Sequence, residues 1–223
     1  MNDLAHRCFL FTRSARIARS IVPTLAAVAT ALLLAAAAPT GPAYAGTPAF
    51  TVSSPDLASG TFDRKFTLNA FGCAGSNVSP AIQWSNLPAG TKSLALQVQD
   101  KDAAAGNGFW HWTVYNIPAS ASGLPQGAGN ASATLPSPAF GGANDFVDTG
   151  ATGQNGNYGG PCTPIGDKPH HYIFTLYALA VDDVQTAAGI PKTGTADLYS
   201  FIINKGLGDK LLGKATFTAS YGR

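Results

Sequence analysis

Residues 109–117 read Phe-Trp-His-Trp-Thr-Val-Tyr-Asn-Ile, and they give the strongest structural signal in the chain. Aromatic and β-branched side chains of this kind favour a pleated, half-buried strand. Residues 171–181 alternate in a similar way, and residues 93–99 form a third clear strand signal. Together these three segments predict the centre of an antiparallel or mixed β sheet.

Weaker patterns extend this sheet on both sides. Short strands are expected at residues 50–52, 66–68, 81–84 and 214–221, and Thr195 is an expected N-cap for a helix over 196–205 that ends at Gly206. The chain has 25 Gly and 15 Pro, and all its acidic residues are Asp, a composition that disfavours a helical bundle. We expect one mostly β domain, a β sandwich with one or two short peripheral helices.

The first 45 residues have the order of a secretory signal peptide. Four arginines precede an uncharged apolar run at residues 21–38, and Ala43-Tyr44-Ala45 supplies a small-residue cleavage site. Cleavage there leaves residues 46–223 as the mature domain, secreted or periplasmic and without stable membrane insertion. An uncleaved membrane anchor is the alternative, because the run is almost long enough to span a bilayer.

Charge and cysteine content narrow the class of protein. Without the leader the chain has ten basic and eleven acidic residues and no basic stripe, so nucleic acid is not an expected partner. Cys73 and Cys162 remain as an even pair, and a bridge between them would close a loop of roughly 90 residues. Free buried thiols or a metal site are the alternatives for this pair.

Three polar clusters lie at strand ends or on the aromatic strand. Asp100 and Asp102 follow the 93–99 strand, His111 lies between two tryptophans, and His170 and Tyr172 begin the 171–181 region. Alternation predicts that Trp110 and Trp112 share one face opposite His111, and that His170 and Tyr172 share a face opposite His171. On neighbouring strands, two imidazoles and a phenol would offer donors to an anion, while the Asp could orient an imidazole or accept from a ligand ammonium.

The ordered motifs of the mature chain resemble the phosphatidylethanolamine-binding protein family, in its bacterial YbhB/YbcL-like branch related to Raf kinase inhibitor protein. The pieces are Asn77-x-Ser79-Pro80-x-x-x-Trp84, Asp100-x-Asp102-Ala103, Trp110-His111-Trp112-x-Val114-x-Asn116-Ile117-Pro118 and Gly160-Pro161-x-x-Pro164-x-Gly166-Asp167-x-x-His170-x-Tyr172. The resemblance covers about residues 50–221. It implies a β sandwich with a small pocket for phosphate-like or other anionic groups.

Carried over position by position, the resemblance places seven residues in that pocket: Asp100, Asp102, His111, Gly160, Pro161, His170 and Tyr172. Cys73 and Cys162 resemble the cysteine pair of exported bacterial relatives. The chain departs from the family pattern where Lys101 and Ala104 replace prolines, where Thr163 replaces a frequent proline and where His171 replaces an arginine. The missing prolines predict a more mobile loop after Asp100.

These residues predict an exported, non-catalytic binding protein for a small anion, either phosphate or a phosphate-bearing headgroup, with no cofactor. A protein partner, inhibited through the irregular region 120–166, is the alternative function. Two His and two Asp would also suit a metal, although no H-x-x-x-H spacing supports one. Hydrolysis is a further alternative, but the chain has no G-x-S-x-G motif.

Overall fold

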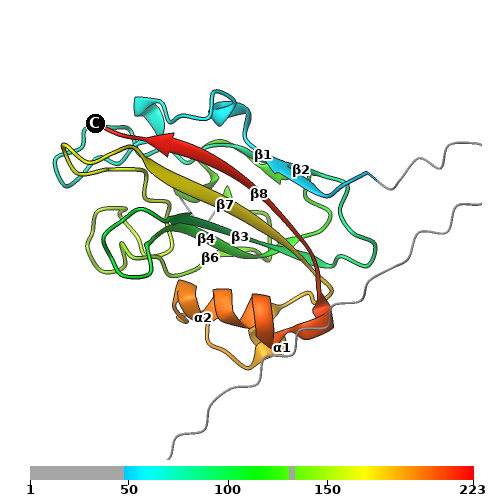
Figure 1. Cartoon of the computed structure of the whole chain (residues 1–223). Coiled ribbons are helices and arrows are strands. Elements are labelled where there is room, and N and C mark those ends of the chain that lie inside the picture. The colour runs from blue at the N-terminus through cyan, green and yellow to red at the C-terminus, as the bar shows by residue number, and fades with distance from the viewer. Residues whose placement is uncertain (1–47, 131–133) are drawn as a thin grey trace, which may run out of the picture. The chain divides into compact units, whose positions relative to one another are not determined.

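Two antiparallel sheets build the protein, which a computed structural model describes over residues 48–130 and 134–223 (Figure 1). The larger sheet has the strand order β6-β4-β3-β7-β8, and the smaller has the order β1-β2-β5. The strands are β1 Thr51–Ser53, β2 Ile82–Ser85, β3 Ser93–Asp100, β4 Phe109–Pro118, β5 Gly123–Leu124, β6 Phe140–Gly141, β7 His170–Leu179 and β8 Leu211–Tyr221. The prediction of a mostly β sandwich is confirmed, while the predicted signal peptide lies outside the described residues.

Two short helices lie against the larger sheet, on the side away from β1 and β2 (Figure 1). They are α1 Val184–Ala188 and α2 Ala196–Phe201, and α2 continues as a π-helical turn, Ile202–Gly206. The predicted cap is present, because Thr195 Oγ1 accepts a hydrogen bond from Leu198 N. Single 3-10 turns occur at Pro55–Leu57, Arg64–Phe66, Ala128–Asn130 and Gly208–Lys210. Among the described residues, no helix is both long and apolar enough to cross a bilayer.

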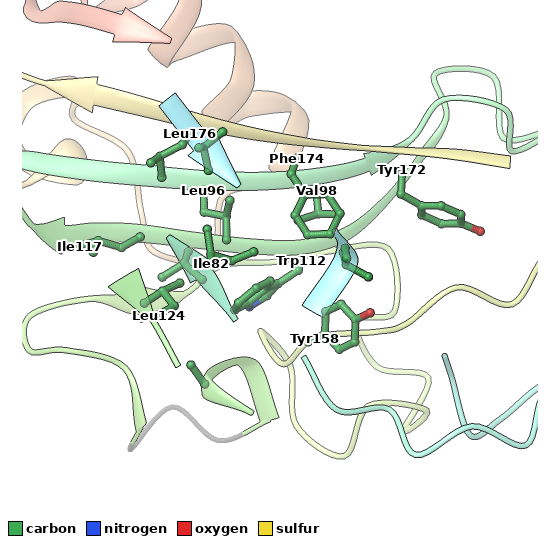
Figure 2. Close-up of a cluster of buried hydrophobic side chains, with 14 of the residues drawn as sticks. Ile82, Leu96, Val98, Trp112, Ile117, Leu124, Tyr158, Tyr172, Phe174 and Leu176 are labelled. Atoms are coloured by element: carbon green, nitrogen blue, oxygen red, sulfur yellow. The ribbon is translucent and has the colours of Figure 1, made fainter. Parts of the chain in front are cut away.

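Both faces of the larger sheet are covered, and this explains why its central strand is buried along its whole length. The main apolar core lies between the two sheets and includes Trp112, Tyr158 and Phe174 (Figure 2). A second core lies on the helix side, where Tyr115 stacks on Tyr199 at a ring-centroid distance of 3.9 Å. Residues of β3 therefore alternate between the core that lies between the sheets and the helix side of the sheet.

A β-bulge in β4 changes the direction of the aromatic side chains. Val98 pairs with Trp112 and Gln99 pairs with Trp110, so His111 is an extra residue on its strand. Trp110 consequently lies on the helix side, where its indole Nε1 donates to Asp197. The prediction that both tryptophans share a face is wrong, because the bulge adds one residue to the period of two.

The segment predicted as a strand at 66–68 is not one. Phe66 ends a 3-10 turn, and Leu68 N donates to Pro161 O instead of to a neighbouring strand. The irregular region 120–166 contains the two-residue strands β5 and β6 and the 3-10 turn Ala128–Asn130. Part of that region folds back over the ends of the central strands and forms one wall of the site described next.

Candidate functional site

Asp100 is the last residue of β3, and its carboxylate is buried at the end of the sheet. Its Oδ1 accepts hydrogen bonds from the backbone N–H groups of Asp102 and Ala103, at 2.9 and 3.1 Å. This turn fixes the loop that lacks the family prolines. Lys101 also donates its own N–H to His171 O at 3.3 Å, a bond that a proline could not make.

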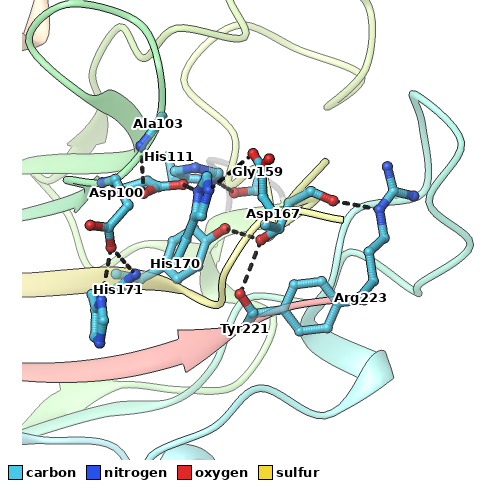
Figure 3. Close-up of polar contacts among 12 residues, drawn as sticks. Asp100, Ala103, His111, Gly159, Asp167, His170, His171, Tyr221 and Arg223 are labelled. Carbon is cyan, nitrogen blue, oxygen red and sulfur yellow. Dashed lines mark hydrogen bonds and ion pairs between the residues drawn. The ribbon is translucent and has the colours of Figure 1, made fainter. Parts of the chain in front are cut away.

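His170 begins β7 and lies between two carboxylates (Figure 3). Its Nδ1 donates to Asp100 Oδ2 at 2.7 Å, and its Nε2 is 3.6 Å from Asp167 Oδ2. The Asp100 carboxylate therefore sets the orientation of the ring. The neighbouring His171 points the other way, as alternation predicts, and pairs with Asp102 on the exposed surface at 2.8 Å.

The bulge in β4 places the buried His111 beside Asp100 and His170. Its Nδ1 lies 2.8 Å from Gly159 O, and because a carbonyl only accepts, Nδ1 carries the proton. Burial lowers the pKa of His111 from 6.5 to about 4, so the ring is neutral near pH 7 and Nε2 is an acceptor. Both imidazoles were expected to donate to a ligand, whereas a neutral His111 offers an acceptor at Nε2.

Tyr172 completes the group that adjacent strands bring together. It pairs with Asp100 across β3 and β7, and its ring contacts that of His111 at a centroid distance of 5.0 Å. Its hydroxyl lies 3.2 Å from Thr163 Oγ1, and burial raises the pKa of the phenol, which stays protonated. Tyr172 thus keeps a neutral hydroxyl that can donate or accept.

These side chains line a cavity of about 460 Å³, which is within the size range of small-molecule sites. Its walls are largely apolar, with Phe109, Phe146 and the exposed Phe71 among them. The charged residues of the lining are Asp100, Asp145, Asp167 and Arg223, and the remaining lining residues are Leu68, Ala103, Ala104, His111, Thr149, Cys162, Thr163, Pro164, His170 and Tyr172. Burial raises the pKa of Asp145, which accepts from Trp110 N at 2.7 Å.

Four of the seven predicted site residues line this cavity: Asp100, His111, His170 and Tyr172. Asp102, Gly160 and Pro161 are not among its lining residues. Asp102 is paired with His171 outside, and hydrogen bonds from His171 lower its pKa. Gly160 N donates to Asn77 Oδ1 at 2.8 Å, and Pro161 O accepts from Leu68 N at 3.0 Å.

The Gly159–Pro161 segment is consequently a structural support. Gly159 N donates to His111 O, so neither glycine has a free N–H for a ligand. A side chain at Gly160 would bring Cβ to 2.2 Å from Phe66 O, which explains the glycine by close backbone approach.

Sequence reasoning missed the walls of the cavity contributed by irregular segments. Asp145 and Phe146 come from the 120–166 region, which Asn144 ties to β4 by donating to His111 O at 3.2 Å. Arg223 follows the last strand and donates to the carbonyls of Thr163 and Gly72. Periodicity gives no signal for such residues, whereas Asp167, three residues before His170, was visible in the motif.

The predicted disulfide is present between Cys73 and Cys162, with a Cα–Cα distance of 5.9 Å. It joins the segment that carries Phe71 to the segment that carries Thr163, so it ties together two walls of the cavity. Over residues 48–130 and 134–223, no three or more His, Cys, Asp or Glu side chains are grouped as a metal site.

A β sandwich with a ligand-sized cavity at the ends of its central strands has the architecture of a small-ligand binding protein. Residues 58–218 match the family model described as phosphatidylethanolamine-binding protein. The chain belongs to this family.

Individual relatives agree with that assignment. The chain is similar to the UPF0098 protein YbcL of Escherichia coli, with 44% identity over 158 residues that cover 70% of this chain and 80% of YbcL. The crystal structure of E. coli YbcL, described as a new member of the mammalian PEBP family, superposes with a TM-score of 0.66 over 78% of this chain and 98% of that one, at 36% identity. The chain is also similar to a putative lipoprotein, LppC of Mycobacterium tuberculosis, with 40% identity over 64% of this chain and 61% of LppC.

Proposed function

We propose that this protein is an exported, non-catalytic binding protein whose cavity takes a small phosphate-bearing ligand. The observation that favours this function is the convergence of His111, His170 and Tyr172 on one cavity, next to Asp100. Polar groups gathered in an otherwise apolar hollow fix the orientation of a ligand, while apolar walls exclude water.

The charges around the cavity favour a headgroup that also carries an amine over free phosphate. Both oxygens of Asp100 are engaged, Oδ1 by two backbone N–H groups and Oδ2 by His170. Asp145 and Asp167 are further negative groups of the lining, and Arg223 carries a positive charge in the same lining. A dianion alone would meet like charge there, whereas an ammonium could contact a carboxylate while the phosphate contacts Arg223 and the polar rings.

A zwitterion also suits the protonation of His111. The neutral ring accepts at Nε2, and a protonated phosphate oxygen or an ammonium is a donor to it. Tyr172 supplies a hydroxyl beside it. The family description names phosphatidylethanolamine, and its headgroup has both of these charges. We therefore take phosphoethanolamine as the probe of the cavity.

The arrangement of hydroxyl groups supports binding over hydrolysis. A serine-type or threonine-type nucleophile needs a base within hydrogen-bonding reach. Among the described residues, Thr163 Oγ1 donates to Tyr221 O at 3.0 Å and contacts Tyr172, and neither buried histidine is bonded to a hydroxyl. The histidines here are oriented by a carbonyl and a carboxylate with no nucleophile between them.

Export is supported by three observations. The Cys73–Cys162 bridge is of a kind that persists in oxidising compartments. A relative is named a putative lipoprotein, and the leader of residues 1–45 has the order of a signal peptide. We propose a secreted or periplasmic location. The alternative, inhibition of a protein partner through the 120–166 region, stays a prediction.

Titration calorimetry with phosphoethanolamine tests the proposed function. We expect His111→Ala and His170→Ala each to weaken binding at least about tenfold, which corresponds to the loss of one polar contact to a charged group. His171→Ala is the matched control, because it is the next residue along β7 but points away from the cavity. Unchanged affinity in both cavity variants would remove the proposal, and inhibition of a partner that survives both would favour the surface region.

A further inference from the structure

Phe71 adopts a backbone conformation that a phenylalanine rarely takes. Its φ is 51°, in the left-handed region, where the Cβ atom is crowded by the following carbonyl oxygen. The other non-glycine residues with a positive φ in the described part of the chain are all of the types that tolerate it: Asn77, Asn86, Asn116 and Asp148. Phe71 is thus the exception among them, and its side chain is the bulkiest.

A tight turn imposes this conformation. Cys73 N donates to Ala70 O at 2.9 Å, and the two residues between them, Phe71 and Gly72, have φ values of 51° and 79°. Positive φ at both central positions is typical of a type I′ turn. Such a turn favours Asn-Gly at these positions. The glycine fits that preference and the phenylalanine does not, so the local backbone gives no reason for a phenylalanine here.

Packing within the fold does not account for Phe71 either. The residue is 63% exposed, and it belongs to neither of the two apolar cores of the described residues. It lines the cavity that His111 and His170 also line. Residues in strained conformations persist where the surrounding structure holds them, and they gather at ligand-binding sites. The side chain is therefore placed for contact with the occupant of this cavity.

Two ties fix the turn to another wall of the cavity. The disulfide joins Cys73 to Cys162, which is itself part of the lining. Arg223 Nη1 donates to Gly72 O at 2.9 Å. Both ties are made by the two residues that follow Phe71, so its place at the cavity is set before a ligand arrives. A side chain held in this way loses little freedom on binding.

The lining combines two kinds of surface. Polar groups come from the strands, with Asp100 at the end of β3 and His170 and Tyr172 at the start of β7. Phe71 and Pro164 come from the two loops that the disulfide joins. Phosphoethanolamine is charged at both ends and has only a short hydrocarbon link, so it offers little apolar surface to Phe71. A hydrocarbon group esterified to the phosphate would cover the ring, and each methylene group that is buried raises the affinity roughly fourfold.

We propose that Phe71 is a specificity-determining residue, which contacts an apolar ester group on the phosphate of the ligand. The inference rests on the proposed function, because the phosphate-bearing headgroup occupies the polar part of the same cavity. The preferred ligand is accordingly a phosphodiester that carries a hydrocarbon group, and the free monoester binds more weakly. The turn forgoes the asparagine that its backbone favours and gains this apolar contact.

Titration calorimetry of the purified protein with three probes tests the contact. The probes are phosphoethanolamine, glycerophosphoethanolamine, whose ester group is polar, and hexylphosphoethanolamine, whose ester group is apolar. The hexyl ester is expected to bind at least about tenfold more tightly than the glycerol ester, because it buries methylene groups against Phe71. Equal affinities for the two diesters would overturn the inference.

Variants at Phe71 separate this contact from folding. Because asparagine suits the turn, Phe71→Asn is expected to have a thermal midpoint equal to that of the parent or up to about 4 °C higher. Its preference for the hexyl ester over the glycerol ester is expected to fall below about threefold. Phe71→Tyr keeps the ring and should keep the preference to within about twofold.

Phe201→Asn is the matched control, because Phe201 is also 63% exposed but ends α2, outside the cavity. It is expected to keep the full preference for the hexyl ester. A preference that survives in Phe71→Asn, or that is lost equally in Phe201→Asn, would overturn the role of Phe71.

The same titrations separate this inference from the proposed function. Three probes that bind with one affinity, in a way that depends on His111 and His170, would remove the role of Phe71 and leave the headgroup site standing. Binding of all three that is unchanged in His111→Ala and His170→Ala would remove both proposals.

Discussion

Replacing His111 by glutamine removes a buried titrating group from the cavity that Asp100, His170 and Tyr172 also line. We expect the variant to lose part of the acid sensitivity of the parent protein. In the folded state burial lowers the pKa of His111 to about 4, against 6.5 in a solvated chain. The unfolded state therefore binds more protons than the folded state between these two pH values, so stability rises with pH through this window. Stability from His111 is fully present above about pH 6.5 and is lost as the pH falls toward 4.

The size of the effect follows from the pKa difference. A depression from 6.5 to about 4 corresponds to about 3 kcal/mol of unfolding free energy, lost on going from pH 7 to pH 4. Glutamine is neutral at every pH. The variant is therefore expected to lose about 3 kcal/mol less than the parent over the same interval.

Urea unfolding at a series of pH values between 4 and 7.5, followed by tryptophan fluorescence, to which the buried Trp112 contributes, measures this difference. All other ionisable groups are present in both proteins, so the comparison reports on the replacement of His111. His171→Gln is the control, because the same substitution is made at an exposed histidine outside the cavity. Equal losses of stability in the parent and in His111→Gln would refute the buried, neutral histidine.

Three further predictions concern residues in and around the cavity that Asp100, His111, His170 and Tyr172 line. Gly160→Ala is expected to destabilise the protein by about 1–3 kcal/mol, because its Cβ would lie 2.2 Å from Phe66 O, and a thermal midpoint equal to that of the parent would contradict the close approach. The double variant Cys73→Ser, Cys162→Ser removes a crosslink between residues 89 positions apart and should lose about 4 kcal/mol in urea unfolding; no loss would show that the bridge is absent in solution. Asp102→Asn breaks only an exposed pair, so its unfolding free energy should change by less than about 1 kcal/mol and its phosphoethanolamine affinity by less than about twofold; a larger fall in affinity would restore this residue to the site.

The central strands and the buried pair of β7 could be predicted because their signals are periodic. His170 and Tyr172 alternate with the exposed His171, and the structure places the first two in the cavity and the third outside. Asp100 was recognisable as a polar residue directly after an apolar strand. Alternation is a property of the local chain, so it can be recognised before the neighbouring strands are known.

The direction of Trp110 could not be predicted, because the bulge at His111 depends on the register with β3 and not on the period of β4 itself. The apolar run around Phe66 looked like a strand, but Phe66 N and Thr67 N donate within a local 3-10 turn. Leu68 N donates to Pro161 O, in a loop that is distant in sequence. Phe146 reaches the cavity through the fold of an irregular region. Such contacts are set by tertiary packing, which a pattern of residue types does not record.

The proposed site of the headgroup is tested most directly by a crystal structure of the protein grown with phosphoethanolamine. We expect the phosphate within hydrogen-bonding distance of His111 Nε2 or Tyr172 Oη, and the ammonium facing Asp145 or Asp167. A compound bound elsewhere on the protein, with no density between these side chains at saturating concentration, would contradict the account.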